Sequence, residues 1–167
     1  MPKQPKQLYD LFHEVLKDIY FAEKKILAAL PKMARATDSE ELSAAFEKHE
    51  RQTREHVSRL EIVFQIIGET PRGKGCPAII GIIDEGEEII DEFDGSPALD
   101  AGLIGTAQAL EHYEIARYGT LRTWARQLQH NDAVNLLQQT LDEEEATDQV
   151  LNELAQNQIN QKAVAAE

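Results

Sequence analysis

The segment ALEHYEIARYGTL, residues 109–121, has the spacing of a core-facing helix but places glutamates where apolar side chains are expected. When Leu121 faces inward, steps of three and four residues toward the amino terminus bring Tyr118, Glu114 and Glu111 onto the same face. Carboxylates on the buried face of a helix are costly unless something compensates their charge. The segment therefore predicts a helical bundle with a polar site inside it.

The composition fits one globular domain and disfavours polyanionic partners. The chain has 167 residues, 42% of them hydrophobic, which is enough for a sizeable core. Its formal net charge of −13 repels phosphate, so we expect no nucleic acid and no membrane as partner, whereas metal cations are attracted.

Cysteine usage and hydropathy suggest a compartment. Cys76 is the only cysteine and has no partner for an internal disulfide. No segment approaches the roughly 20 consecutive apolar residues of a membrane span, and residues 1–14 lack the apolar stretch of a secretory signal. These features predict a cytoplasmic protein.

Apolar residues recur at spacings of three and four through almost the whole chain, which predicts long helices at roughly 6–34, 39–68, 97–129 and 131–157. Between the second and third, GETPRGKGCP, residues 68–77, predicts a loop, and Pro77 opens a short helix at roughly 77–93. Two helices, a long connection and two more helices have the connectivity of ferritin-like folds. We therefore expect an all-α fold, a ferritin-like four-helix bundle with a long crossover containing a short extra helix, in a single domain over residues 1–167.

Local signals indicate where the helices begin and end. Pro31 lies inside the first apolar pattern, so the helix either ends near Leu30 or kinks and runs on. The polar tail after Asn157 is expected to fray. The residues that predict helix starts are Thr37 with Glu40 or Asp38 with Glu41 as a capping box, Ser96 before Pro97, and Asn131.

Each of the four long helices carries polar residues near the middle of its core-facing row. They are Glu23 on the first helix, His49, Thr53 and His56 on the second, Glu111, Glu114 and Tyr118 on the third, and Glu144 and Asp148 on the fourth. In an antiparallel bundle these midpoints meet, so we expect one buried cluster. Its carboxylates cannot all stay ionised without positive charge among them, which two metal ions would supply. Carboxylate oxygens with a few imidazoles favour iron or manganese, with zinc as an alternative.

Two explanations without metal stay open. Arg117 lies one helical turn from Glu114 and could hold that carboxylate in a surface ion pair. A protonated or salt-bridged polar core would also account for the cluster.

Tyr118 could donate a hydrogen bond to a ligand carboxylate. The residues expected to lie outside the ligand set, on solvated faces or without a role, are His13, Cys76, His112, His130, Asp142, Glu143 and Glu145.

The blocks DIYFAEKKILAALPKMA (18–34), ALEHYEIARYGTL (109–121) and TLDEEEATD (140–148) resemble those of the YciF-type ferritin-like stress proteins of bacteria, and the resemblance covers nearly the whole chain. It implies a rubrerythrin-like or ferritin-like bundle, a homodimer, a dimetal centre and a link to stress responses. The family's motif residues correspond here to Glu23, His49, Glu111, Glu114, Glu144 and Asp148, with His56 as a further correspondence.

The polar residues depart from the usual di-iron carboxylate pattern of Glu-x-x-His on two helices. His49 and His56 are seven residues apart, and the fourth helix offers Glu144 and Asp148 without a histidine. A ferroxidase or oxygenase activity therefore does not follow from the superfamily alone.

Three functions are compatible with these residues. The first is a dimetal centre that consumes peroxide or oxygen, ligated by Glu23, Glu111, Glu114, Glu144 and His49 and completed by His56, Asp148 and Tyr118. The second is a non-enzymatic dimeric stress or interaction protein, in which the polar core only fixes the register of the helices. The third is a passive metal binder.

Overall fold

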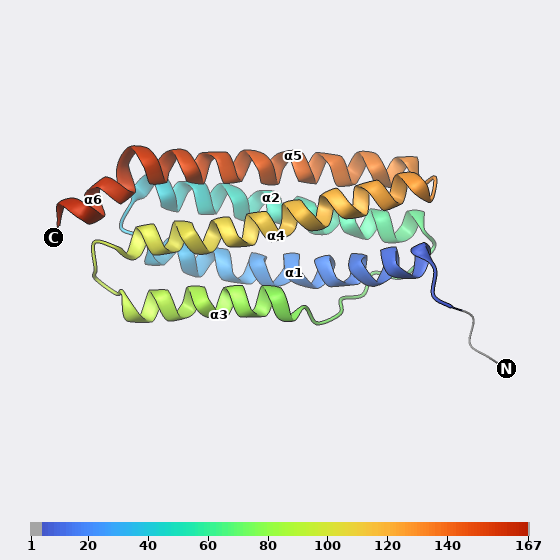
Figure 1. Cartoon of the computed structure of the whole chain (residues 1–167), viewed down its shortest axis with the longest axis horizontal. Helices are drawn as coiled ribbons and strands as arrows, with labels where there is room; N and C mark the ends of the chain where they lie inside the picture. The colour runs from blue at the N-terminus through green and yellow to red at the C-terminus, as the bar shows by residue number, and fades with distance from the viewer. Residues whose placement is uncertain (1–4, 167) are drawn as a thin grey trace.

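Residues 5–166 are described by a computed structural model, and nearly all of them are helical (Figure 1). The elements in chain order are α1 (Leu8–Ala36), α2 (Glu40–Ile66), α3 (Pro77–Glu92), α4 (Leu99–Gln127), α5 (Asn131–Leu154), the π-helical turn η1 (Ala155–Ile159) and α6 (Asn160–Ala165). No strand occurs within the described residues. The predicted all-α fold, a four-helix bundle with a long crossover containing a short helix, is confirmed.

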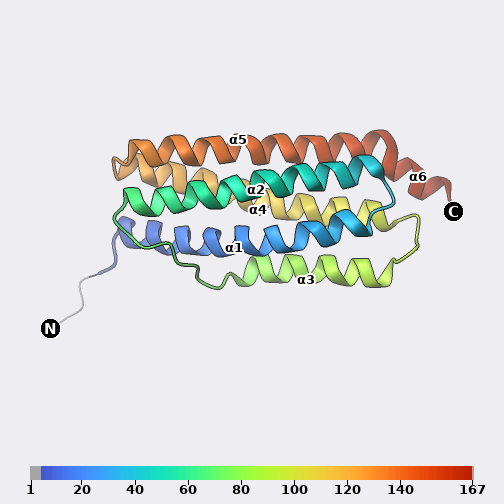
Figure 2. The ribbon, with the colours of Figure 1, turned by 180° about the vertical axis from the view of Figure 1, so that it is seen from behind.

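The bundle consists of two helix pairs joined by the crossover. α1 packs against α2 and α4 against α5, and the pairs meet where α2 contacts α5 and α1 contacts α4. After α2 the chain runs along the outside of α1 before it enters α3, as the view from behind shows (Figure 2). There the Lys74 N–H donates a hydrogen bond to the carbonyl oxygen of Lys17 at 3.0 Å. The short helix α3 then covers one side of α1 and α4.

The core is built from the apolar rows that the three- and four-residue spacing predicts. Burying each large apolar side chain contributes about 1.5–3 kcal/mol, so these rows stabilise the bundle around its polar middle. Every helix in residues 5–166 is too short or too polar to span a lipid bilayer. Buried members of the rows include Phe12, Leu16, Ile19, Ile26, Leu30, Leu42, Phe46, Leu60, Val63, Leu121, Leu137, Leu141 and Leu151.

The start of α2 differs from the predicted capping boxes. Ser39 is the N-cap, in place of Thr37 or Asp38, and its Oγ accepts a hydrogen bond from the Leu42 N–H at 3.2 Å. Thr37 instead ends α1, and its hydroxyl donates to Asp100 of α4. Three adjacent residues of types that cap helices lie here, and the contact with Asp100 engages the hydroxyl of Thr37 elsewhere.

The starts of α4 and α5 also differ from the predicted caps. α4 begins at Leu99, because Ser96 caps the turn before it and accepts a hydrogen bond from the Ala98 N–H at 3.2 Å. Asn131 is the first residue of α5, and its N-cap is His130, whose side chain makes no capping hydrogen bond. α4 therefore begins two residues after the predicted position, whereas α5 begins at the predicted residue 131 but with His130 in place of Asn131 as its N-cap.

The chain stays helical through Pro31 and past residue 157, and a buried apolar side chain lies near each of these points. α1 runs on through Pro31 to its end at Ala36, and Met33 in its last turns is buried. The prediction that the tail frays after residue 157 was wrong for the described residues, since Ile159 of η1 is only 2% exposed and packs into the core. Burial of one apolar residue in each segment favours continued helix over fraying.

Two glycines let α3 lie close to α4. A Cβ atom at Gly86 of α3 would lie 2.6 Å from Thr106 Cγ2, and one at Gly102 of α4 would lie 2.6 Å from Ile89 Cγ2. Both contacts are shorter than any packed carbon pair, and Ile89 is branched at Cβ, so its methyl cannot move without rotating the side chain. The position of the crossover helix therefore depends on these two glycines.

We predict that Gly102→Ala is less stable than Gly105→Ala by about 1–3 kcal/mol. Both glycines are in α4, but nothing lies within 4 Å of a Cβ atom at Gly105, so only Gly102→Ala overpacks the contact with Ile89. The gain of about 1 kcal/mol in helix propensity is common to both variants. Urea denaturation followed by circular dichroism measures the difference, and equal stabilities would show that α3 does not sit at this distance.

Candidate metal centre

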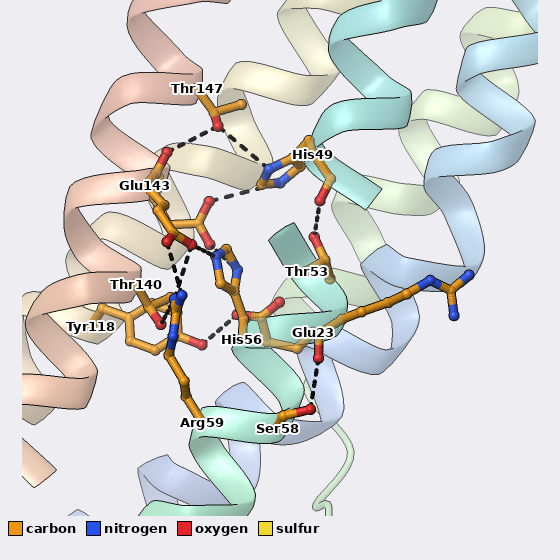
Figure 3. Close-up of polar contacts among 12 residues, drawn as sticks. Glu23, His49, Thr53, His56, Ser58, Arg59, Tyr118, Thr140, Glu143 and Thr147 are labelled. Carbon is orange, nitrogen blue, oxygen red and sulfur yellow. Dashed lines mark hydrogen bonds and ion pairs between the residues drawn. The ribbon is translucent and has the colours of Figure 1, made fainter. Parts of the chain in front are cut away.

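Six of the seven predicted ligands meet in the middle of the bundle, buried between α1, α2, α4 and α5. Each is at most 2% exposed. They are Glu23 of α1, His49 and His56 of α2, Glu111 and Glu114 of α4, and Glu144 of α5. Figure 3 labels three of them, Glu23, His49 and His56.

The six side chains form two groups that share one carboxylate. One ligand atom from each of His49, Glu111, Glu114 and Glu144 lies within 4.8 Å of all the others, and the same holds for Glu23, His56 and Glu144. Glu144 Oε2 lies 3.7 Å from His49 Nε2, whereas its Oε1 lies 2.9 Å from His56 Nδ1. The two oxygens of Glu144 therefore face different groups, as in a bridging carboxylate.

Eight buried nitrogen and oxygen atoms of these six residues have no hydrogen-bond partner among the described residues. Each such atom costs about 1–3 kcal/mol when nothing replaces its lost contact with water. They are Glu23 Oε2, His49 Nε2, His56 Nδ1, Glu111 Oε2 and both carboxylate oxygens of Glu114 and Glu144. A cation between the side chains would satisfy them together, and this set of carboxylate oxygens and imidazole nitrogens suits iron, manganese or zinc. The residues therefore fit a bound metal ion.

Burial makes ionisation of the carboxylates unfavourable without such a cation. It raises the pKa of Glu111 to about 8, to which the charge of Glu23 adds. Burial likewise raises the pKa of Glu144 to about 8, although His56 opposes the rise. For Glu114, burial and the charges of Glu144, Glu23 and Glu111 raise the pKa well above its ordinary value. Without metal, the site holds protons that an exposed glutamate would have lost.

The two imidazoles respond differently to the same surroundings. Burial lowers the pKa of His49, although the charge of Glu144 opposes this effect. Burial also acts against a charged His56, but Glu23 and Glu144 outweigh it and raise the pKa of His56 to about 11. Without metal, His56 therefore supplies the positive charge nearest to Glu23 and Glu144.

Two hydroxyls on the core-facing rows support the ligands. Tyr118 is fully buried and donates a hydrogen bond to Oε1 of Glu23, as the sequence suggested. The hydroxyl of Thr53, also buried, donates to the carbonyl oxygen of His49 at 2.9 Å, within α2. Tyr118 therefore restrains a ligand carboxylate directly, whereas Thr53 does not contact the cluster's donor atoms through this bond.

The seventh predicted ligand, Asp148, lies to one side of the cluster and belongs to neither group. Its Oδ1 accepts a hydrogen bond from Gln108 at 3.1 Å and lies 3.2 Å from Nε2 of His112, whose side chain is 67% exposed. Asp148 follows Glu144 by four residues, so it lies one turn further along α5, where its side chain is 24% exposed. The structure thus pairs it with α4 side chains.

The surface ion pair that could have explained Glu114 does not form. Glu114 is fully buried, and the Arg117 guanidinium lies over the Tyr113 ring, 5.0 Å from its centroid. The hydroxyl of Tyr113 in turn donates to Asp18 at 2.7 Å and lies 3.0 Å from Sγ of Cys76, which is buried. Arg117 is therefore part of a contact network on the other side of α4.

Glu143 contacts the cluster, although its place in an acidic run predicted a solvated face. Its carboxylate binds the Arg59 guanidinium through two hydrogen bonds of 2.8 and 2.9 Å and lies 2.8 Å from His56 Nε2. Burial opposes its ionisation, but hydrogen bonds from Arg59 and His56 hold the pKa of Glu143 below its ordinary value. The sequence feature that could have indicated this role of Glu143 is Arg59, which follows His56 by three residues and so lies on the same side of α2.

Two other histidines are less solvated than predicted. The ring of His130 stacks on Phe12 with centroids 6.4 Å apart, and the ring of His13 packs edge-on against Phe64 at 6.0 Å. Nδ1 of His13 also lies 3.8 Å from a carboxylate oxygen of Glu69. Both are partly buried near the ends of the bundle and do not contact the cluster.

Comparison with known proteins places this chain among close relatives. A family model described as a domain of unknown function, DUF892, matches residues 7–164. Protein YciF of Escherichia coli (strain K12) is 43% identical over 159 residues, which are 95% of this chain and 96% of YciF. The similarity that the sequence blocks suggested is thus confirmed.

Solved structures agree with the sequence matches. The crystal structure of the E. coli stress protein YciF covers 93% of this chain and 99% of its own, with a TM-score of 0.89 at 43% identity. The structure of YcfI of Rhodopseudomonas palustris covers 91% of this chain and 97% of its own, with a TM-score of 0.86 at 42% identity. A Xanthomonas campestris pv. campestris protein, 20% identical with a TM-score of 0.71 and 96% coverage of both chains, shares the fold.

We predict that the metal-free protein loses stability as the pH rises from about 6.5 to about 8. Glu111 and Glu144 have folded-state pKa values of about 8, so their contribution is complete below the unfolded value of 4.5 and is lost as the pH rises through about 8. His56, with a folded pKa of about 11 against 6.5, changes stability in the same direction over this window. His49 acts oppositely, but only below pH 6.5.

The free energy of unfolding should fall by about 1.4 kcal/mol per pH unit for each proton that only the folded state retains. Denaturant titrations of chelator-treated protein at several pH values measure this slope. The slope should flatten after metal is added, because a cation stabilises the ionised carboxylates. Stability that is constant or rising over the same window in the metal-free protein would contradict the buried, protonated cluster.

Proposed function

The chain belongs to the DUF892 family, and we propose that it is a YciF-like stress protein whose bundle holds two iron or manganese ions that react with peroxide or oxygen. The observation that carries the proposal is the set of eight buried nitrogen and oxygen atoms on four helices that have no hydrogen-bond partner among the described residues. A protein interior seldom leaves so many polar atoms unsatisfied together. Positive charge bound among them removes the penalty.

The grouping of these atoms favours two ions over one. Glu144 belongs to both ligand groups and turns a different oxygen to each of them, toward His49 in one and His56 in the other. Glu111 and Glu114 complete the first group and Glu23 the second. We therefore propose that Glu144 bridges two ions, and that the remaining five residues bind them from either side.

Two redox-active ions held close together would supply electrons to a bound oxidant. The protein's own side chains would support such a centre in three ways. The carboxylates balance the ionic charge, and the Tyr118 hydroxyl fixes the orientation of Glu23 and holds a proton at its Oη within the buried site. The apolar rows around the cluster exclude water and so strengthen each electrostatic contact.

A second candidate is a non-enzymatic role. A structural function has been suggested for the R. palustris relative, and a polar cluster can fix the register of packed helices without any reaction. In this case the protein binds metal passively or not at all. On the resemblance to the YciF-type proteins we further propose that the chain forms a homodimer in either case.

We predict that the purified protein contains two iron or manganese ions per chain and that two substitutions reduce this number differently. Glu144→Gln should lose both ions, because its carboxylate serves both groups, whereas Glu23→Gln should lose mainly the ion beside His56. Glu145→Gln, an exposed neighbour on the same helix, should keep both. Elemental analysis of protein purified without chelators from metal-replete cells measures the content, with circular dichroism as the check on folding.

The same samples separate the candidate functions. Anaerobic protein loaded with ferrous iron should be oxidised on addition of peroxide or oxygen, seen as the ultraviolet absorbance of ferric iron, and Glu144→Gln should not. Two bound ions that neither oxidant oxidises would indicate passive binding. A parent protein that takes up no stoichiometric metal under replete conditions would rule out the dimetal centre.

A further inference from the structure

Both imidazoles of the cluster are contacted on their outer nitrogens by side chains of one turn of α5 (Figure 3). Oγ1 of Thr147 lies 3.4 Å from Nδ1 of His49, and Oε2 of Glu143 lies 2.8 Å from Nε2 of His56. The inner nitrogens, Nε2 of His49 and Nδ1 of His56, are among the buried atoms without a hydrogen-bond partner in residues 5–166. The two rings thus present different nitrogens to the site.

The hydrogen of Thr147 decides which nitrogen of His49 carries a proton. A threonine hydroxyl has one hydrogen, and that of Thr147 is donated to the carbonyl oxygen of Glu143 at 2.9 Å. Toward His49 the hydroxyl oxygen can therefore only accept. A neutral His49 satisfies this arrangement when its Nδ1 bears the hydrogen and its Nε2 keeps the lone pair, which faces Glu111 and Glu144.

The carboxylate of Glu143 determines which ring nitrogen of His56 carries the proton, and the result is the opposite of that for His49. Both of its oxygens accept hydrogen bonds from the Arg59 guanidinium, which keeps the group ionised and unable to donate. The contact with His56 is therefore a hydrogen bond from Nε2–H, which leaves Nδ1 as the nitrogen that can bind a metal. That nitrogen faces Glu144 at 2.9 Å and Glu23 at 3.5 Å.

We propose that Thr147 and Glu143 are positioning residues that set the tautomers of His49 and His56, so that His49 binds metal through Nε2 and His56 through Nδ1. This inference rests on the proposed metal function of the cluster. Thr147 and Glu143 lie one helical turn apart and flank Glu144, so the turn of α5 that supplies the bridging carboxylate also orients both imidazoles. Neither residue belongs to the two groups of candidate ligands.

Nuclear magnetic resonance reads the two tautomers directly. Zinc is diamagnetic, so long-range proton–nitrogen correlations of the imidazoles can be recorded on zinc-loaded protein. The proposal predicts the ring proton on Nδ1 of His49 and on Nε2 of His56. A proton on Nε2 of His49, or on Nδ1 of His56, in the loaded protein would overturn it.

Variants test whether the α5 residues impose this arrangement. Thr147→Val keeps the shape but removes the acceptor, and Glu143→Gln removes the charge that Arg59 and His56 share. Each should weaken zinc binding about ten- to a hundredfold in competition titrations with a chelator. Thr147→Ser should restore the affinity and the His49 tautomer, and Glu145→Gln should change neither. Unchanged affinity and tautomers in both Thr147→Val and Glu143→Gln would refute the assignment.

Failure of this inference is distinguishable from failure of the proposed function. If wild-type protein binds no zinc, iron or manganese, the metal function fails, and the assigned metal-binding nitrogens fail with it. If metal binds with normal stoichiometry but the imidazole protons lie on the other nitrogens, only the positioning role is wrong. The His49 correlation in metal-free protein at neutral pH gives the same readout without any ion, and Thr147→Val should alter it.

Discussion

The central constraint on this protein is electrostatic: four glutamates and two histidines occupy the buried middle of a helical bundle. Burying one uncompensated carboxylate costs several kcal/mol even after relaxation, so four of them require protons or cations nearby. Without metal, burial raises the pKa of Glu111 and Glu144 to about 8, and His56 provides positive charge. Metal would replace those protons, so metal binding, pH and stability are coupled through the same six side chains.

The rest of the fold holds the six side chains together. Apolar rows above and below the cluster join the four helices, and each of these helices contributes at least one of the six side chains, so a shift in any helix changes the cluster. The crossover helix α3 contributes none of the six, yet it covers α1 and α4 at close approach through Gly86 and Gly102. On the opposite side, the ion pair of Arg59 with Glu143 joins α2 to α5 next to His56. The cluster is thus enclosed by packing on one side and by polar contacts on the other.

The sequence was sufficient for features that depend on helical periodicity and insufficient for those that depend on contacts between helices. Glu23, Glu114 and Glu144 could be placed inside because they interrupt otherwise apolar rows at regular spacing. Adjacent positions along a helix differ by about 100° in direction, so the row containing Glu144 did not reveal that Glu143, the preceding residue, contacts His56. Asp148 lies on the predicted row, but its contacts with Gln108 and His112 of α4 keep it beside the cluster. The contact of Thr37 with Asp100 joins residues far apart in sequence, and the roles of Thr147 and Arg59 depend on hydrogen bonds between α2 and α5, so periodicity along one helix predicts none of them.

X-ray diffraction from crystals grown with manganese, recorded at the manganese absorption edge, is the most direct test of this explanation. Two anomalous peaks should lie between α1, α2, α4 and α5, one on each side of the Glu144 carboxylate, with Nε2 of His49 and Nδ1 of His56 among the ligands. An interior without anomalous density, with Glu144 and its neighbours hydrogen-bonded only to one another or to water, would contradict it.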